Sequence, residues 1–180
     1  PRAESLARML GAIDTSQVTT NLWGERWTKL TVNSMGNGLS AISGLESGSL
    51  SNLPLAQGLT IKLAAEAIRV GQALGYKLEP IRSLPAKDWI AAEEGNGSAL
   101  ERVIDGTRAN GKRLGEGGRP STGQDIVKGR RTEIEFLNGL VATKGREVGI
   151  PALTHEAVTD LVARVERGEI KPDPNHLQQL

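Results

Sequence analysis

A chain of 180 residues is long enough for one domain with a hydrophobic core and too short for two large ones. Its 22 basic and 21 acidic residues leave a net charge of +1, so we expect no nucleic-acid partner, because nucleic-acid-binding domains usually carry a clear basic excess. The absence of cysteine excludes disulfides and thiolate metal sites, and with only two histidines, His155 and His176, we expect no metal.

The first residues predict the end of a preceding domain. The chain begins at Pro1 without a signal-peptide pattern, and no apolar run approaches the ~20 residues that cross a bilayer, so we expect an excised or processed, cytoplasmic chain with no membrane partner. A helical apolar stripe over residues 2–13 is followed by a β-prone run over residues 17–20. Because a lone strand cannot bury its edges, residues 1–21 are interpreted as a short α/β remnant, the tail of a missing nucleotide-binding domain.

Residues 22–170 carry helical periodicity, which predicts an all-α domain of six or seven helices. The first helix is expected over residues 22–37, with Asn21 as its N-cap and an apolar side formed by Leu22, Trp23, Trp27 and Leu30. A helix of some twenty residues is predicted to begin at Pro54 and to end at a left-handed Gly75. Further helix starts are predicted at Pro85, Ser98, Ser121 and Thr154. Residues 171–180, with two prolines, are expected to be a flexible tail.

A glycine-rich stretch, residues 106–120, is predicted to be a mobile loop. We expect it to become ordered over the site when ligands bind, and a surface insertion without a role is the alternative. Ser121 and Gln124 have capping-box spacing, which predicts a helix that continues past Gly129 to about Val148.

The first candidate site is a polar strip. Lys29, Asn33 and Asn37 recur every four residues, so they lie on one face of the predicted helix. Their neighbours are apolar, and the strip is therefore expected to face a partly buried space in which loss of solvation would favour proton donation by Lys29. The alternative is that Lys29 extends into solvent and the asparagines satisfy backbone groups.

The second candidate site is the helix start at Ser121, where a hydroxyl and free backbone amides could bind a ligand carboxylate. Ordinary capping is the alternative for Ser121. Glu133 is expected on the same helix, three turns further on, where an exposed ion pair is its other interpretation.

Taken in order, these segments resemble the C-terminal domain of the ketopantoate reductase (2-dehydropantoate 2-reductase) family. The resemblance covers most of residues 20–165 and implies a fold of the 6-phosphogluconate-dehydrogenase C-terminal type. The matching blocks are residues 22–30 with Asn33 and Asn37, Ser121 with Gln124-Asp125, residues 129–135, Asn138-Gly139 and Gly149-Ile150-Pro151.

The resemblance implies an NADPH-dependent oxidoreductase of pantothenate biosynthesis that reduces 2-dehydropantoate or a related 2-keto acid. It implies that Lys29 is the catalytic general acid, that Asn33, Asn37 and Ser121 bind the substrate, and that Glu133 lies on the cofactor side. Expected partners are the keto acid and the chain's own N-terminal Rossmann domain, which binds most of the NADPH; a homodimer is left open. The alternative is a non-catalytic helical binding or dimerisation module on the same fold.

Three departures from the family pattern concern specificity. Gly38 stands where many members have proline, and Ser47 stands where some members have another substrate-binding asparagine. Thr122-Gly123 replaces a more apolar pair. The choice of keto acid is therefore left open to branched or bulky substrates other than 2-dehydropantoate.

Overall fold

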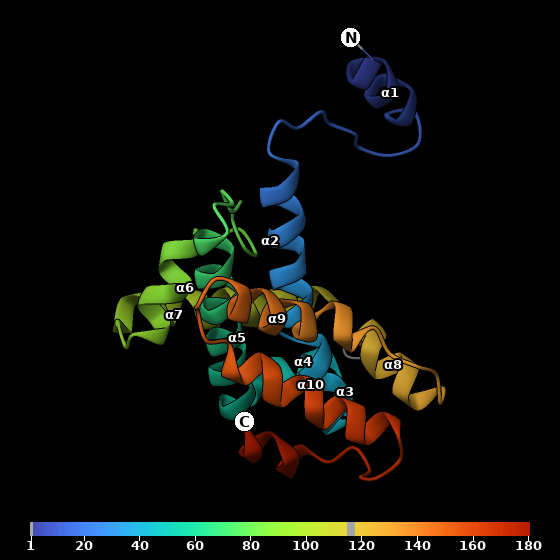
Figure 1. The fold of residues 1–180 in the computed structure, drawn as a ribbon, viewed down its shortest axis with the longest axis vertical. Coiled ribbons are helices and arrows are strands. Elements are labelled where there is room, and N and C mark those ends of the chain that lie inside the picture. The colour runs from blue at the N-terminus through green and yellow to red at the C-terminus, as the bar shows by residue number, and fades with distance from the viewer. Residues whose placement is uncertain (1, 115–117) are drawn as a thin grey trace.

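The computed structural model describes residues 2–114 and 118–180, which form an all-α bundle, as predicted (Figure 1). Within those ranges there is no strand, and extended backbone pairs only in an isolated bridge between Ile81 and Leu84. No helix in these ranges is long and apolar enough to cross a membrane. The helices, with η for 3-10 turns, are α1 Arg2–Leu10, α2 Leu22–Ser34, α3 Asn37–Ser43, α4 Ser47–Asn52, α5 Pro54–Ala73, α6 Ala86–Glu93, α7 Gly97–Leu114, α8 Ser121–Val127, η1 Ile134–Phe136, α9 Asn138–Glu147, α10 Leu153–Glu166 and η2 Pro174–Gln179.

The centre of the bundle is α5, whose boundaries the sequence predicts correctly. Pro54 occupies its first turn, and Gly75 follows its end at φ +79°, a conformation that favours glycine. Helices α2, α4, α6, α7, α9 and α10 all pack against α5, so residues around most of its circumference are buried. One stripe of the helix, which includes Gly58 and Lys62, remains exposed, and most of its aliphatic residues are buried on the other sides.

The packing of α2 on α5 depends on Trp27 and Gly71. The Trp27 indole Nε1 donates a hydrogen bond of 2.8 Å to the backbone oxygen of Ala67. A Cβ atom on Gly71 would lie 2.4 Å from the same Nε1, so only glycine permits this approach. Leu22 and Trp23, which were expected on the apolar side of this helix, lie in its first turn and are exposed.

The N-terminal segment differs in part from the prediction. Helix α1 forms as expected, but it stands apart from the bundle and has no buried residue (Figure 1). Residues 17–20 are not a strand, because the described part of the chain contains no strand with which they could pair. The assignment of residues 1–21 to a preceding domain stays a prediction.

The prediction of a mobile loop over residues 106–120 is wrong for its first nine residues, because α7 continues to Leu114. Ala99, Val103 and Thr107 recur every four residues and are buried against neighbouring helices, which stabilises the helix despite its glycines. Gly106 also lets the side chain of Leu84 approach closely. Residues 115–117 of the predicted loop lie outside the described residues.

The single helix predicted from Ser121 to Val148 is three separate elements, α8, η1 and α9. Gly129 lies just beyond the end of α8 at φ +62°, a conformation that favours glycine and interrupts the helix that was predicted to continue past it. The predicted capping box of Ser121 and Gln124 does not form either. Pro120 occupies the N-cap position, and the Gln124 side-chain amide donates to the backbone oxygen of Arg119 at 2.8 Å.

The C-terminal residues pack on the bundle, in contrast to the expected flexible tail. Leu177 in η2 is completely buried in the main core. The backbone N–H of Asp173 donates to the backbone oxygen of Ile42 in α3 at 2.9 Å. The last residues therefore cover the outer side of α3, which carries one of the candidate site residues.

Candidate functional site

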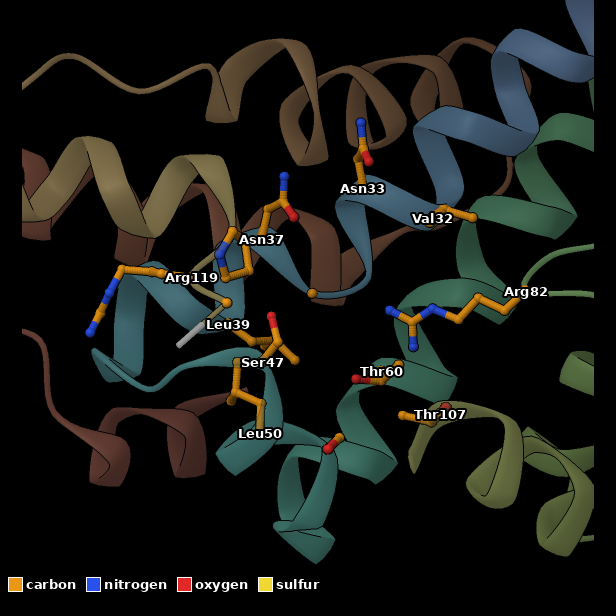
Figure 2. A pocket seen from close by; sticks show the side chains of 14 residues that line it. Val32, Asn33, Asn37, Leu39, Ser47, Leu50, Thr60, Arg82, Thr107 and Arg119 are labelled. Atoms are coloured by element: carbon orange, nitrogen blue, oxygen red, sulfur yellow. The ribbon is translucent and has the colours of Figure 1, made fainter. Parts of the chain in front are cut away.

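A cavity of about 330 Å³ lies between α2, α3, α4, α5 and α7 (Figure 2). This volume suits a small organic ligand. The polar side chains that line it come from elements far apart in the sequence and include Asn33, Asn37, Ser47, Thr60, Arg82 and Thr107.

The predicted polar strip is only partly continuous. Helix α2 ends at Ser34, and a short turn leads to Asn37, the first residue of α3. Because this turn is short, the half-buried amides of Asn33 and Asn37 still line the same cavity. Lys29 is exposed and does not line it, so the described part of the chain does not supply the expected loss of solvation around its ammonium group.

The structure brings Ser121 to the edge of the cavity. The side-chain Nδ2 of Asn37 donates a hydrogen bond to Ser121 Oγ at 3.3 Å, although the two residues are 84 positions apart. The contact forms because α8 packs on α3, where a Cβ atom on Gly123 would lie 2.7 Å from Ser40 Oγ. Two of the predicted site residues are thus direct neighbours.

Glu133 lies outside this group. It is exposed and stands just before η1, so the prediction that it shares a helix with Ser121 is wrong. Its neighbour Ile134 is buried next to Gly38, whose ideal Cβ position lies 3.4 Å from Ile134 Cδ1. Since Gly38 follows Asn37 directly, Glu133 lies near the start of α3 but faces solvent.

Arg82 was not predicted from the sequence, and its guanidinium group points into the cavity (Figure 2). Burial lowers the pKa of this group to about 10, and its Nε atom is buried without a hydrogen-bond partner. No motif surrounds Arg82 in the sequence, and it lies in the connection between α5 and α6. Thr107 was missed because it falls in the stretch that was predicted to be a loop.

The other arginine at the cavity, Arg119, has a structural role. Its Nη1 donates to the backbone oxygen of Gly44 at 2.7 Å, and its Nη2 lies 3.7 Å from a carboxylate oxygen of Glu46. Its guanidinium group points away from the cavity in Figure 2. These partners compensate the positive charge of Arg119, whereas Arg82 has no such partner among the described residues.

The chemistry of the cavity is that of a receptor for an anionic ligand that also accepts hydrogen bonds. It offers amides, hydroxyls and one unpaired guanidinium group, and none of the described residues that line it is acidic. Among the described residues no group of three histidine, cysteine or acidic side chains is placed to hold a metal ion.

Comparison with known proteins shows which sequences and folds this chain is similar to. The family model described as "Ketopantoate reductase PanE/ApbA C terminal" matches residues 21–166. A 2-dehydropantoate 2-reductase of Archaeoglobus fulgidus is 30% identical over 142 residues, which are 79% of this chain and 40% of that protein. Another, from Pyrobaculum aerophilum, is 28% identical over 76% of this chain and 41% of its own length. The chain thus spans about two fifths of the length of the curated relatives it matches.

Solved structures agree with the fold. A PanE/ApbA family ketopantoate reductase from Ralstonia eutropha JMP134 superposes with a TM-score of 0.72 at 26% identity, over 92% of this chain and 49% of that one. D-mandelate dehydrogenase in complex with NADH and anilino(oxo)acetate gives a TM-score of 0.73 at 22% identity, over 93% of this chain and 62% of that one. The second likeness is evidence for the fold alone.

Proposed function

This chain belongs to the ketopantoate reductase family as its C-terminal domain, and on that premise we propose that it supplies the substrate-binding and catalytic half of an NADPH-dependent 2-keto acid reductase. The substrate is 2-dehydropantoate or a related keto acid. One observation carries the proposal: Asn33 and Asn37 line one cavity, and Ser121 accepts a hydrogen bond from Asn37 at its edge. Lys29 precedes Asn33 by one turn of α2. In this proposal residues 1–21 continue a preceding Rossmann domain and residues 22–170 bind the substrate.

Lys29 is the proposed general acid. Reduction of a ketone places negative charge on its oxygen in the transition state, and a nearby ammonium group stabilises that charge and donates the proton. The exposure of Lys29 in this chain is consistent with a site that the other half of the enzyme covers. Asn33, Asn37 and Ser121 orient the keto acid by hydrogen bonds without adding charge.

The cofactor would supply the hydride and is proposed to bind mainly outside this chain. The described residues contain no glycine-rich turn between a strand and a helix, the element that binds a dinucleotide pyrophosphate. The exposed carboxylate of Glu133, next to the start of α3, fits a contact at the edge of a cofactor that approaches from the side of the preceding domain.

The test is Lys29→Ala in the full-length enzyme. We expect kcat for keto acid reduction to fall by ~10²- to 10⁴-fold, the usual contribution of general acid catalysis, while the Kd for NADPH changes little. Lys87→Ala, which removes an exposed lysine of α6, is the matched control and should keep the parent rate. A kcat for Lys29→Ala within about threefold of the parent value would exclude Lys29 as the acid.

A further inference from the structure

Arg82 carries a charge that the described residues leave uncompensated. Its guanidinium group makes no hydrogen bond or ion pair with any of them, and its Nε atom is fully buried. Burying a charge without a partner is costly, and such groups normally occur where a counter-ion binds. With a pKa of about 10, the group stays positively charged at neutral pH.

The backbone at Arg82 is strained as well. Ile81 and Leu84 exchange two backbone hydrogen bonds of 2.8 and 3.0 Å around a two-residue turn. The turn residues Arg82 and Ser83 have φ values of +50° and +66°, which favour glycine and asparagine. Glycine would relax this turn, so the backbone conformation does not account for an arginine at this position. We therefore attribute the arginine to a role of its side chain.

Two hydroxyl groups complete the surroundings of the guanidinium group. Thr60 of α5 and Thr107 of α7 line the same cavity, are 7% and 6% exposed, and make no side-chain hydrogen bond within the described ranges. Figure 2 shows both on the floor of the cavity below Arg82. A planar guanidinium fork flanked by hydroxyls matches the two oxygens of a carboxylate.

We propose that Arg82 binds a carboxylate of the substrate and determines the specificity of the site for acids. The proposal rests on the proposed reductase function, because it assigns the charge of the keto acid to a residue of the same cavity. Asn33, Asn37 and Ser121 are neutral and can orient the ligand, but they cannot neutralise it. Arg119, the second arginine at the cavity, already has its partners. Only Arg82 among the described lining residues has a free positive charge.

The experiment compares Arg82→Met with the parent in the full-length enzyme, using a 2-keto acid and its methyl ester. Losing one partner of a buried charge pair should raise the KM for the acid, and the Kd of the hydroxy acid product measured by calorimetry, about 30-fold or more. The parent should bind the ester correspondingly weakly, and Arg82→Met should no longer discriminate acid from ester. Arg102→Met, which removes an exposed arginine of α7, controls for the change in net charge.

A dicarboxylic 2-keto acid tells which carboxylate is bound. An effect of Arg82→Met on monocarboxylic and dicarboxylic acids alike places the carboxylate beside the keto group on Arg82, whereas an effect on dicarboxylic acids alone places the distal one there. Either result supports the proposal. Unchanged KM and Kd, or preserved discrimination between acid and ester, would overturn it.

Stability separates binding from a structural role. Because Arg82→Gly relaxes the turn and removes a partly buried, unpaired charge, its melting temperature should equal or exceed that of the parent while binding of the acid is lost. A lower melting temperature with intact binding would contradict the proposal. If the parent lacks keto acid reductase activity, the proposed function fails, but the calorimetric comparison still decides whether Arg82 binds a carboxylate.

Discussion

The buried His155 should make the stability of the protein depend on pH between about 6.5 and 4. Its side chain is completely buried, and the Nε2–H donates to the backbone oxygen of Leu63 at 2.9 Å. The other ring nitrogen, Nδ1, accepts from the side-chain amide of Asn138 at 3.1 Å. Protonation would place a second donor against that amide, so the ring is held neutral.

Desolvation by burial lowers the pKa of His155 from 6.5 to about 4, although the hydrogen bond to Leu63 opposes the shift. Because the folded-state pKa is the lower one, the unfolded chain binds the proton more tightly between the two values. The stabilisation is therefore complete above pH 6.5 and is lost as the pH falls towards 4. With about 1.4 kcal/mol per pKa unit, the loss at about pH 4.5 is roughly 2.5 kcal/mol.

The assay is the free energy of unfolding from urea titrations of the full-length protein, at about pH 7 and about pH 4.5. Carboxylates also titrate in this range, so the parent is compared with His155→Gln, in which this contribution is absent. His176→Gln removes the other histidine, which is exposed, and should leave the pH dependence of the parent intact. The decrease should be larger by roughly 2.5 kcal/mol in the parent than in His155→Gln.

Parallel decreases in the parent and in His155→Gln would refute this reasoning. So would an NMR titration of the folded protein in which the His155 ring protonates near its ordinary pKa. The carboxylate of Glu66 accepts a hydrogen bond from the backbone N–H of His155 at 3.2 Å and not from the ring. A result near the ordinary pKa would mean that this carboxylate compensates the buried charge.

Two further predictions concern packing. Gly71→Ala should lower the free energy of unfolding by about 1–3 kcal/mol in denaturant titrations, because the new methyl group overlaps the Trp27 ring. Gly58→Ala on the same helix meets open space and should be neutral or stabilise by up to ~1 kcal/mol; equal effects of the two changes would refute the overlap. Leu177→Ala should destabilise by about 2–5 kcal/mol in the same assay, whereas Leu153→Ala, at an exposed position, should cost little. A neutral Leu177→Ala would mean that the C-terminal residues do not contribute to the core.

The sequence predicts helices well where local signals and packing agree. Pro54 and Gly75 mark the ends of α5, and the central position of this helix requires the apolar residues between them. The stretch 106–114 was mistaken for a loop because glycine signals there conflict with burial on one face, and burial wins when a neighbouring helix covers that face. Local signals alone cannot reveal which faces are covered.

The candidate site was predictable to the extent that its residues share one short segment. The four-residue spacing of Asn33 and Asn37 indicated a common face, and both amides line the cavity even though the helix ends between them. Ser121 was found as a predicted helix start, and only the order of the family's blocks linked it to Asn37, since no periodicity connects the two residues. Its contact with Asn37 depends on the packing of α8 against α3.

Arg82 could not be predicted because it lies outside the helices, and two other polar residues of the site stand at comparable positions. Asn37 follows a turn, Ser121 begins α8, and Arg82 lies in a turn with positive φ values, so all three stand where regular structure is interrupted. Hydrophobic periodicity predicts helices and strands, but it gives no information about the turns and helix ends between them. At such points backbone direction changes, and side chains from separate helices can converge on one small ligand. The helices of this bundle thus hold the polar residues in place, and in the proposed function the residues at the interruptions between helices contact the ligand.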